Sequence, residues 1–328
     1  MDTIHWGVLG PGRIAHAFAK GLAVIEGGKL YASASRDLER AKSFNARYGA
    51  ERAYASYEEL VNDPRVDAVY VATPHNFHYA HTKLALEAGK AVLCEKPFTV
   101  NAREAKELID LARAKNLFLM EAVWTRYLPI FKVVREWLDS GAIGEVIHVS
   151  STIGFCVPRV LEGRMFNHDL AGGALLDLGL YPVSTSQWIF RRNPQSFRAD
   201  VFLGETQVDE VTHAILNYGN GVSSTFCCSL LGRLQGDMQI AGTKGTIRIH
   251  PQFWCSKIAT ISRSYDSFET VERPFLASGF EYEIEAAMKA IRAGAIEEPT
   301  MPHADTLGNM ELADAIRASA NFRYRFEK

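Results

Sequence analysis

The 328-residue sequence has no long run of apolar residues, so no membrane-spanning helix is implied. A membrane-spanning helix needs about 20 mostly apolar residues in succession, and no stretch here approaches that length. The first residues, MDTIHWGVLG, also lack a basic region followed by a long apolar run. We therefore expect no membrane partner and no signal peptide.

Cysteine is also scarce. The five cysteines form an odd set without any C-x-x-C spacing: Cys94, Cys156, Cys227, Cys228 and Cys255. Such a set does not provide a disulfide framework or a zinc ribbon. Reduced, mostly buried thiols in a cytoplasmic protein are the prediction.

No excess of one charge sign is present either. The net charge is only −2, so neither nucleic acid nor an anionic membrane surface is expected as a partner. With 47% hydrophobic and 23% charged residues, the composition is that of an ordinary globular protein. The length favours two domains over one.

Short apolar strands alternate with helices in the first part of the chain, residues 1–123. The expected strands cover 4–10, 29–35, 66–73, 91–97 and 117–122, and the expected helices cover 13–22, 37–49, 78–90 and 102–116. Nearly solid apolar strands between helices indicate a parallel sheet covered on both faces. We predict an N-terminal Rossmann domain, a doubly wound parallel sheet that binds a dinucleotide.

The pattern changes in residues 124–328, the predicted substrate and dimerisation domain. Turns such as YGNGV and GTKGT indicate that the strands on either side of them form hairpins. The expected helices cover about 127–140, 173–190, 281–294 and 303–321. The prediction is an α+β domain with a large open, mainly antiparallel sheet, within a chain of α/β class overall. Its last helix (about 303–321) is a candidate for packing back on the first domain.

A glycine turn follows the first strand, as Gly10-x-Gly12-x-x-Ala15, and opens a helix with Arg13 and Ile14. Small residues permit a tight turn, close approach of the backbone to a pyrophosphate, and close helix–strand packing. The free N–H groups at the start of the helix then face the phosphates. These five residues are predicted to bind the cofactor.

The end of the second strand favours NADP(H), although NAD(H) stays open. Ser35 and Arg36 stand there, and Arg40 follows one helical turn later. Guanidinium groups suit the oxygens of a 2′-phosphate. Asp37 is the counter-indication, because an acidic residue at this position binds the ribose hydroxyls of NAD. Its position also suits the N-cap of the following helix.

The segments Thr73-Pro74-x-Asn76-x-His78 and Glu95-Lys96-Pro97, together with the glycine turn, resemble the glucose–fructose oxidoreductase/inositol dehydrogenase (Gfo/Idh/MocA) family. The resemblance implies that these two segments lie along the cofactor, with Asn76 and His78 at its nicotinamide end. For Glu95, bracing of the turn or of the cofactor ribose is favoured over proton chemistry.

Within that family, MEAVWTRYLP (120–129) and AGGALLDLGLYPV (171–183) are most similar to the dimeric dihydrodiol dehydrogenase and D-xylose 1-dehydrogenase branch. Many members carry Asp-x-x-x-His here, whereas this chain carries Asp177-x-x-x-Tyr181. The resemblance implies hydride transfer with Tyr181 as acid/base. A phenol titrates near ~10, so it needs a cation, and Lys96 would supply it. Asp177 would orient Lys96 or the substrate hydroxyl.

The implied substrate is an aldose oxidised at C1, or a trans-dihydrodiol, related vicinal diol or dicarbonyl. Two alternatives remain: a reductase of an anhydro-sugar or ketosugar, and a regulator that binds NADP without turnover. Lys96 and Tyr181 together disfavour the regulator, because pure binding needs neither.

Further side chains are candidates for the substrate pocket: Trp124, Arg126, Phe155, Trp254 and Phe280, with Arg164 as a cofactor or substrate contact. The spacing His75-x-x-His78-x-x-His81 imitates a metal site, but no acidic residue or cysteine joins it at ligand spacing, so no metal is expected. TFCCSLL and its neighbours predict a sheet with one uncovered apolar face, and the family buries such a face in a homodimer.

Overall fold

The computed structural model describes residues 3–264 and 267–327, and the chain divides into two compact units. The first comprises residues 1–124 and 275–307, and the second comprises 125–274 and 308–328. The sequence places everything after residue 123 in the second domain, whereas the structure returns 275–307 to the first unit. Composition along the chain does not reveal such a return, because it depends on packing between residues far apart in sequence.

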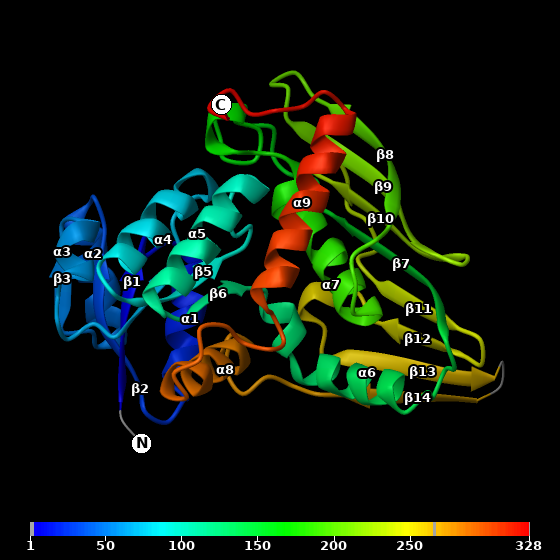
Figure 1. Ribbon diagram of the computed structural model, residues 1–328, viewed down its shortest axis with the longest axis horizontal. Coiled ribbons are helices and arrows are strands. Elements are labelled where there is room, and N and C mark those ends of the chain that lie inside the picture. Colours follow the sequence, from blue (N-terminus) through cyan, green and yellow to red (C-terminus); the bar gives the residue numbers. More distant parts are fainter. Residues whose placement is uncertain (1–2, 265–266, 328) are drawn as a thin grey trace. The chain divides into compact units, whose positions relative to one another are not determined.

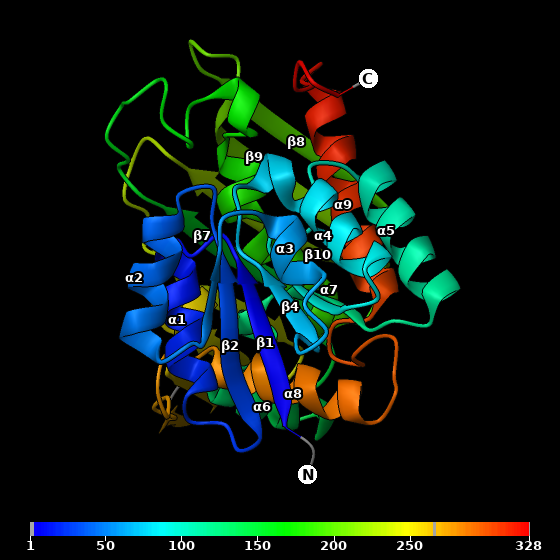
Figure 2. The same ribbon diagram turned by 90° about the vertical axis from the view of Figure 1, so that its left-hand side faces the viewer.

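Six parallel strands form the sheet of the first unit, in the order β3-β2-β1-β4-β5-β6. The strands are β1 (Ile4–Leu9), β2 (Gly28–Ala34), β3 (Arg52–Tyr54), β4 (Ala68–Val71), β5 (Ala91–Glu95) and β6 (Leu119–Ala122). The helices are α1 (Arg13–Leu22), α2 (Leu38–Tyr48), α3 (Tyr57–Val61), α4 (His78–Glu87), α5 (Ala102–Lys115) and α8 (Glu281–Arg292). Figure 2 shows α1 and α2 on one face of this sheet, with α3, α4 and α5 on the other.

This arrangement confirms the predicted Rossmann sheet. The strand order reverses between β1 and β4, and dinucleotides bind at the carboxyl ends of the strands at such a switch point. The short elements β3 and α3 were not predicted, because three to five residues carry too little periodic pattern to be recognised.

Aromatic packing between α1 and the strands fixes the first core. Ala15, Phe18 and Leu22 recur on the buried face of α1. The Phe18 ring stacks on Tyr70 of β4 with a centroid separation of 4.0 Å, and it meets Trp6 of β1 edge-on at 5.3 Å. Helix α1, which begins at the glycine turn, is thereby held on the sheet.

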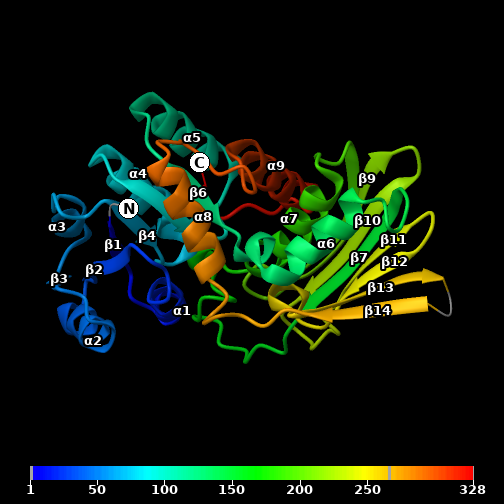
Figure 3. The ribbon, with the colours of Figure 1, turned by 90° about the horizontal axis from the view of Figure 1, so that it is seen from below.

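Eight strands form the sheet of the second unit, in the order β14-β13-β12-β11-β7-β10-β9-β8 (Figure 1). Among the strand pairs that the structure describes in this sheet, only β7 and β10 run in parallel, which confirms the mainly antiparallel prediction. The strands are β7 (Val146–Gly154), β8 (Ser196–Leu203), β9 (Asp209–Gly219), β10 (Val222–Ser229), β11 (Met238–Gly242), β12 (Thr246–Ile249), β13 (Ile258–Ser264) and β14 (Ser267–Glu272). The helices α6 (Pro129–Asp139) and α7 (Leu180–Phe190) lie on one face (Figure 3).

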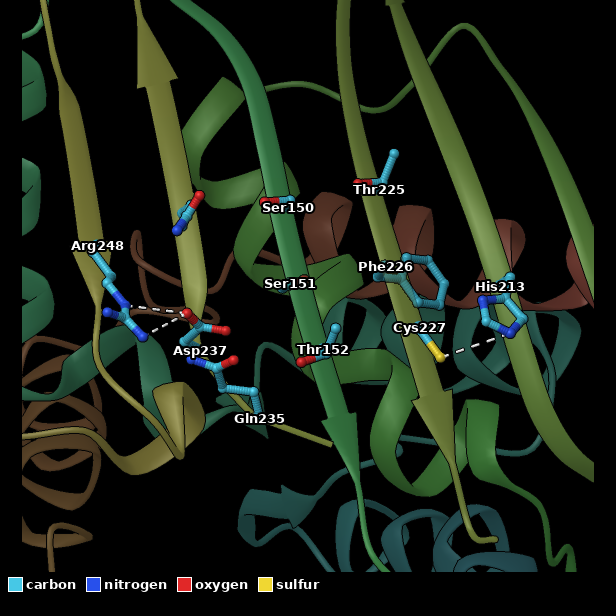
Figure 4. Close-up of a pocket in the computed structure, with 11 residues that line it drawn as sticks. Ser150, Ser151, Thr152, His213, Thr225, Phe226, Cys227, Gln235, Asp237 and Arg248 are labelled. Atoms are coloured by element: carbon cyan, nitrogen blue, oxygen red, sulfur yellow. Dashed lines mark hydrogen bonds and ion pairs between the residues drawn. The ribbon is translucent and has the colours of Figure 1, made fainter. Parts of the chain in front are cut away.

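The opposite face of this sheet is polar, which corrects the expectation of an uncovered apolar face. One row of paired positions crosses seven strands on that face: Arg198, Ile215, Thr225, Ser150, Gln239, Arg248 and Thr260. A shallow depression of about 620 Å³ follows the same face, with the Asp237–Arg248 ion pair on one side of it (Figure 4). The apolar side chains of β10, Phe226 and Cys228, are buried under the helices. Alternation of buried and more exposed positions, clear along β8 and β9, separates the two faces.

The helix predicted at 173–190 begins with one π-turn, Leu175–Gly179, and continues as α7. The last helix, α9 (His303–Ser319), starts in the first unit and continues in the second from Gly308. None of the helices in the described part of the chain is long and apolar enough to cross a membrane.

Candidate active site

The glycine turn after β1 has the shape of a phosphate cradle. Gly10 adopts a φ of +79°, and an added Cβ would lie 2.9 Å from Thr73 Cγ2, so only glycine fits. At Gly12 the nearest atom to an added Cβ is the Gly10 carbonyl oxygen, at 3.9 Å, so this side of the turn is open. The first turn of α1 contains no acidic side chain among the described residues. An anionic pyrophosphate therefore fits at this helix N-terminus.

The end of β2 carries two guanidinium groups and a capping carboxylate. Asp37 accepts the backbone N–H groups of Glu39 and Arg40 at 3.1 and 3.3 Å, so it is the N-cap of α2. Arg36 lies over the Phe77 ring at 5.8 Å from the centroid. The positive charges of Arg36 and Arg40 both act on the phenol of Tyr57, opposing the rise of its pKa that burial causes. Two cations therefore cluster where the adenosine ribose of a dinucleotide would end.

His78 connects the two loops that carry the family-like motifs. Its ring nitrogens lie 2.7 Å from the carbonyl oxygens of Thr73 and of Pro97. The side chain is fully buried, and its two ring nitrogens face these backbone oxygens. His78 therefore positions the Thr73 segment against the turn that holds Lys96.

Glu95 stands at the carboxyl end of β5, directly before Lys96, and accepts a hydrogen bond from the buried Tyr70 hydroxyl. A second carboxyl group, Glu283 of α8, lies near it and is fully buried. Burial and the neighbouring charge of Glu95 raise the pKa of Glu283 well above its usual range. Sequence reasoning missed Glu283 because nothing along α8 distinguishes it from the exposed Glu285 of that helix.

Two substrate candidates of the first unit pack against each other. The rings of Trp124 and Phe280 have centroids 4.7 Å apart, and Phe275 meets Trp124 at 6.4 Å. Phe280 is buried, so Trp124 is the member of this pair with exposed surface.

In the second unit, Tyr181 and Asp177 lie on the helical segment that starts at Leu175. Asp177 accepts a hydrogen bond from Arg164 at 3.0 Å, so Arg164 contacts a proposed functional carboxylate. The Tyr181 ring lies 6.4 Å from Trp254, and Trp254 lies 5.6 Å from Phe155. In this unit the Tyr181 phenol therefore lies beside the Trp254 ring, which in turn contacts the Phe155 ring.

Arg126, another of the predicted substrate residues, makes structural contacts within the second unit. Its guanidinium group is buried and donates to Ser184 Oγ at 2.9 Å, to the Ser184 carbonyl at 2.7 Å and to Gln187 Oε1 at 2.7 Å. It therefore fastens the segment after β6 to α7. The neighbouring Thr125 hydroxyl donates to the Trp254 carbonyl at 2.7 Å, which places that tryptophan.

No group of three or more His, Cys, Asp or Glu side chains within residues 3–264 and 267–327 could hold a metal ion. Two of the histidines in the H-x-x-H-x-x-H spacing make different contacts. His78 binds the backbone, whereas His81 Nδ1 lies 2.9 Å from Thr73 Oγ1.

A doubly wound parallel sheet, an open glycine turn at a helix start and a basic strand end define the class: a nicotinamide-dinucleotide-dependent oxidoreductase. Residues 4–123 match the family model described as "Oxidoreductase family, NAD-binding Rossmann fold", and residues 131–248 match "GFO/IDH/MocA C-terminal domain". The chain belongs to the GFO/IDH/MocA family, and it is an NAD(P)-dependent dehydrogenase or reductase.

Individual relatives agree with this family and with the predicted branch. The trans-1,2-dihydrobenzene-1,2-diol dehydrogenase of Mus musculus is 33% identical over 337 residues, covering 99% of each chain. A 3-ketoreductase of Actinomadura kijaniata, solved with NADP and TDP-benzene, is 29% identical with a TM-score of 0.85, over 97% of this chain and 98% of that one. An aldose–aldose oxidoreductase of Caulobacter crescentus shares the fold, with a TM-score of 0.88 at 23% identity, over 97% and 98%.

Replacing Arg126 tests its structural assignment. Arg126→Met keeps the length of the side chain but leaves the Ser184 carbonyl and Gln187 amide oxygen without their donor. We expect the free energy of unfolding to fall by about 2–4 kcal/mol, measured by urea denaturation, with the substrate KM unchanged. Arg103→Met, on the exposed side of α5, is the control and should change stability by less than about 0.5 kcal/mol. A raised KM with intact stability would return Arg126 to the substrate site.

Proposed function

We propose that this protein is an NADP(H)-dependent oxidoreductase that transfers a hydride between nicotinamide C4 and a carbinol or carbonyl carbon of a sugar or vicinal diol. Tyr181 is the proposed acid/base, with Lys96 and Asp177 as its assistants. The observation that carries the proposal is the grouping in the second unit: Tyr181 beside Trp254, on the same helical segment as an Asp177 paired with Arg164.

The chemistry explains why these residue types are needed. When bound, the nicotinamide supplies hydride transfer. Interconversion of a carbinol and a carbonyl also moves one proton at the oxygen, and Tyr181 would take or return it. An isolated phenol titrates near ~10 and is a weak base at neutral pH. A nearby ammonium group stabilises the phenolate, and Lys96 would supply that charge.

The ion pair of Arg164 with Asp177 supports a role for this carboxylate as a hydrogen-bond acceptor. The guanidinium group favours the charged form, which accepts hydrogen bonds only. A carboxylate in that state orients a hydroxyl group of a sugar or diol, or the ammonium of Lys96. Trp254 and the partly exposed Phe155 add flat apolar surface that suits the face of a small ring.

The substrate class is proposed as an aldose of the D-xylose type or a trans-dihydrodiol. The likeness to the mouse diol dehydrogenase over nearly the whole chain favours the diol. The likeness to the 3-ketoreductase favours a second candidate, reduction of a ketosugar. A panel of aldoses, trans-dihydrodiols and ketosugars, followed by absorbance of NADPH, separates them. Turnover of none of these would overturn the proposal.

The cofactor preference is proposed as NADP(H) because two observations agree. Asp37 is engaged as a helix cap, and the charges of Arg36 and Arg40 converge on one phenol. A phosphate on the adenosine ribose would meet two guanidinium groups there, which bind such oxyanions with charge-assisted hydrogen bonds.

A homodimer through the open sheet and a cytoplasmic location complete the proposal. The family resemblance supports the dimer, but the polar character of the face means that hydroxyl, amide and charged side chains would make most contacts. Ile215 and Phe202 are its large exposed apolar side chains on β9 and β8. The five free cysteines fit a reducing compartment.

Removing the proposed acid/base should abolish turnover while leaving cofactor binding intact. We expect Tyr181→Phe and Lys96→Ala to lower kcat by roughly 10²–10⁴-fold, because each removes a group used in proton transfer. NADPH binding to Tyr181→Phe is measured by fluorescence titration and should not change. Tyr79→Phe and Lys83→Ala in α4 are the matched controls. Near-wild-type turnover in both Tyr181→Phe and Lys96→Ala would sink the assignment.

The cofactor preference predicts a selective loss with NADP(H). Arg36→Ala and Arg40→Ala should each lower kcat/KM for NADP(H) by roughly 10–100-fold, because a charge-assisted hydrogen bond contributes about 1.5–3 kcal/mol. The kcat/KM values of these variants for NAD(H) should stay within about 3-fold of those of the unaltered protein. Arg47→Ala, at the other end of α2, is the control. Equal efficiency of the unaltered protein with both cofactors contradicts the preference.

The dimer predicts a particle of twice the 36.5 kDa chain mass by light scattering. Ile215→Glu places a charge on the open sheet face, and burial of that charge should shift the protein toward the monomer. Val24→Glu is a matched control, because Val24 is 53% exposed and Ile215 is 51% exposed. A monomer in the unaltered protein would refute the dimer.

A further inference from the structure

Asp209, the first residue of β9, lies against the N-terminal end of the helical segment that carries Asp177 and Tyr181. Its side chain is 1% exposed. Oδ2 accepts the backbone N–H of Leu175 at 2.6 Å and the Thr212 hydroxyl at 3.2 Å. Leu175 opens the π-turn, and the residue before it is Ala174, whose side chain offers no acceptor. Asp209 therefore serves as the missing helix cap from a separate strand.

The other carboxylate oxygen of Asp209 shapes the glycine turn that precedes this helical segment. Gly173 has a φ of +133°, and an added Cβ would lie 2.1 Å from Asp209 Oδ1. A residue with a side chain is thus excluded twice, by the backbone conformation and by the carboxylate. The turn and the helix start are built around one buried acid.

The same turn is held from two further directions within the second unit. The buried Tyr324, near the C-terminus, donates its hydroxyl to the Gly172 carbonyl at 2.6 Å. The N–H groups of Gly172 and Gly173 donate to the carbonyls of Asn167 and Met165, at 3.0 Å each. The loop that contains Arg164 is therefore tied to the turn as well. Movement of the turn would displace both the Arg164 loop and the start of the helical segment.

The charge state of Asp209 changes near neutrality. Burial raises its pKa to about 7, while the Leu175 N–H, the Thr212 hydroxyl and the positive charge of Arg317 oppose that rise. Burial above all, together with the charge of Asp209, raises the pKa values of two neighbouring groups, Cys228 and Tyr324, well above their usual range. The positive end of the helical segment favours the carboxylate. Above pH 7 the helix start therefore faces a negative charge, and below it a neutral acid.

We propose that Asp209 is a positioning residue for the reaction, which fixes the Gly172–Gly173 turn and the π-turn so that Asp177 and Tyr181 are presented in their working orientation. This inference rests on the proposed function of Tyr181. Asp209 contacts neither substrate nor cofactor in this account. A π-turn inside a helix often marks a functional site, and here it is the element that Asp209 caps.

The test compares Asp209→Asn with the unaltered protein in the NADPH assay. Asparagine keeps the shape and one acceptor but never carries the charge. At pH 8 we expect kcat to fall by roughly 10–100-fold, because small misplacement of a reacting group has effects of that size. NADPH affinity should not change. At pH 5.5 the two proteins should agree within about 3-fold, because protonated Asp209 resembles asparagine.

A second readout separates positioning from a general loss of structure. In a Tyr181→Phe background, Asp209→Asn should cause little further loss, since the residue acts through Tyr181. Thr212→Val, which removes one donor to the carboxylate, should give a smaller loss with the same dependence on Tyr181. Asp110→Asn, on the exposed side of α5, is the control for removal of a carboxylate. Thermal unfolding of each variant confirms that it is folded.

Three results would overturn the inference: wild-type kcat in folded Asp209→Asn at pH 8, a ratio of kcat values that does not change with pH, or full multiplicativity with Tyr181→Phe. Failure of the proposed function is distinguishable, because it would appear as a fully active Tyr181→Phe. If Tyr181→Phe is fully active, a pH-dependent loss of kcat in Asp209→Asn would mean that Asp209 positions Asp177 alone. If kcat is also unchanged in Asp209→Asn, the positioning role of Asp209 is overturned as well.

Discussion

The parallel direction of the strands in the first unit is the constraint on which the cofactor site depends. Because all six strands run the same way, the loops after β1, β2, β4 and β5 leave the sheet at the same edge. Gly10, Arg36, Asn76 and Lys96 are far apart in sequence, yet each follows one of these strands. Helix α1, held by the Phe18 and Tyr70 stack, then presents its free N–H groups at that edge.

Buried polar side chains, more than apolar ones, hold the functional loops in place. His78 joins the Thr73 segment to Pro97, Arg126 joins the segment after β6 to α7, and Asp209 joins β9 to the start of the π-turn. A buried donor or acceptor without a partner is unfavourable, so each of these groups strongly favours one geometry. Apolar packing alone tolerates small shifts, whereas a hydrogen bond to a specific carbonyl or N–H does not.

Much of the first unit and its cofactor loops was predictable, because local patterns encode them. The strand–glycine–helix motif and the capping residue Asp37 follow from adjacent positions, and the structure shows both. The contacts of Arg126 could not be predicted, because its burial against α7 depends on a helix more than fifty residues later. The predicted apolar character of the open sheet face was wrong, since Phe226 and Cys228 point to the helices and the alternate positions carry polar groups.

The sequence by itself determined the fold class and the family, because each depends on spacing within short segments. Only the tertiary structure decided which polar residues brace the site, because partners such as Asp209 and Leu175, or Glu95 and Glu283, are separated by long stretches of chain. It also decided where the chain returns to its first unit. The physical reason is that burial and charge–charge interactions depend on distances in space, which no local pattern records.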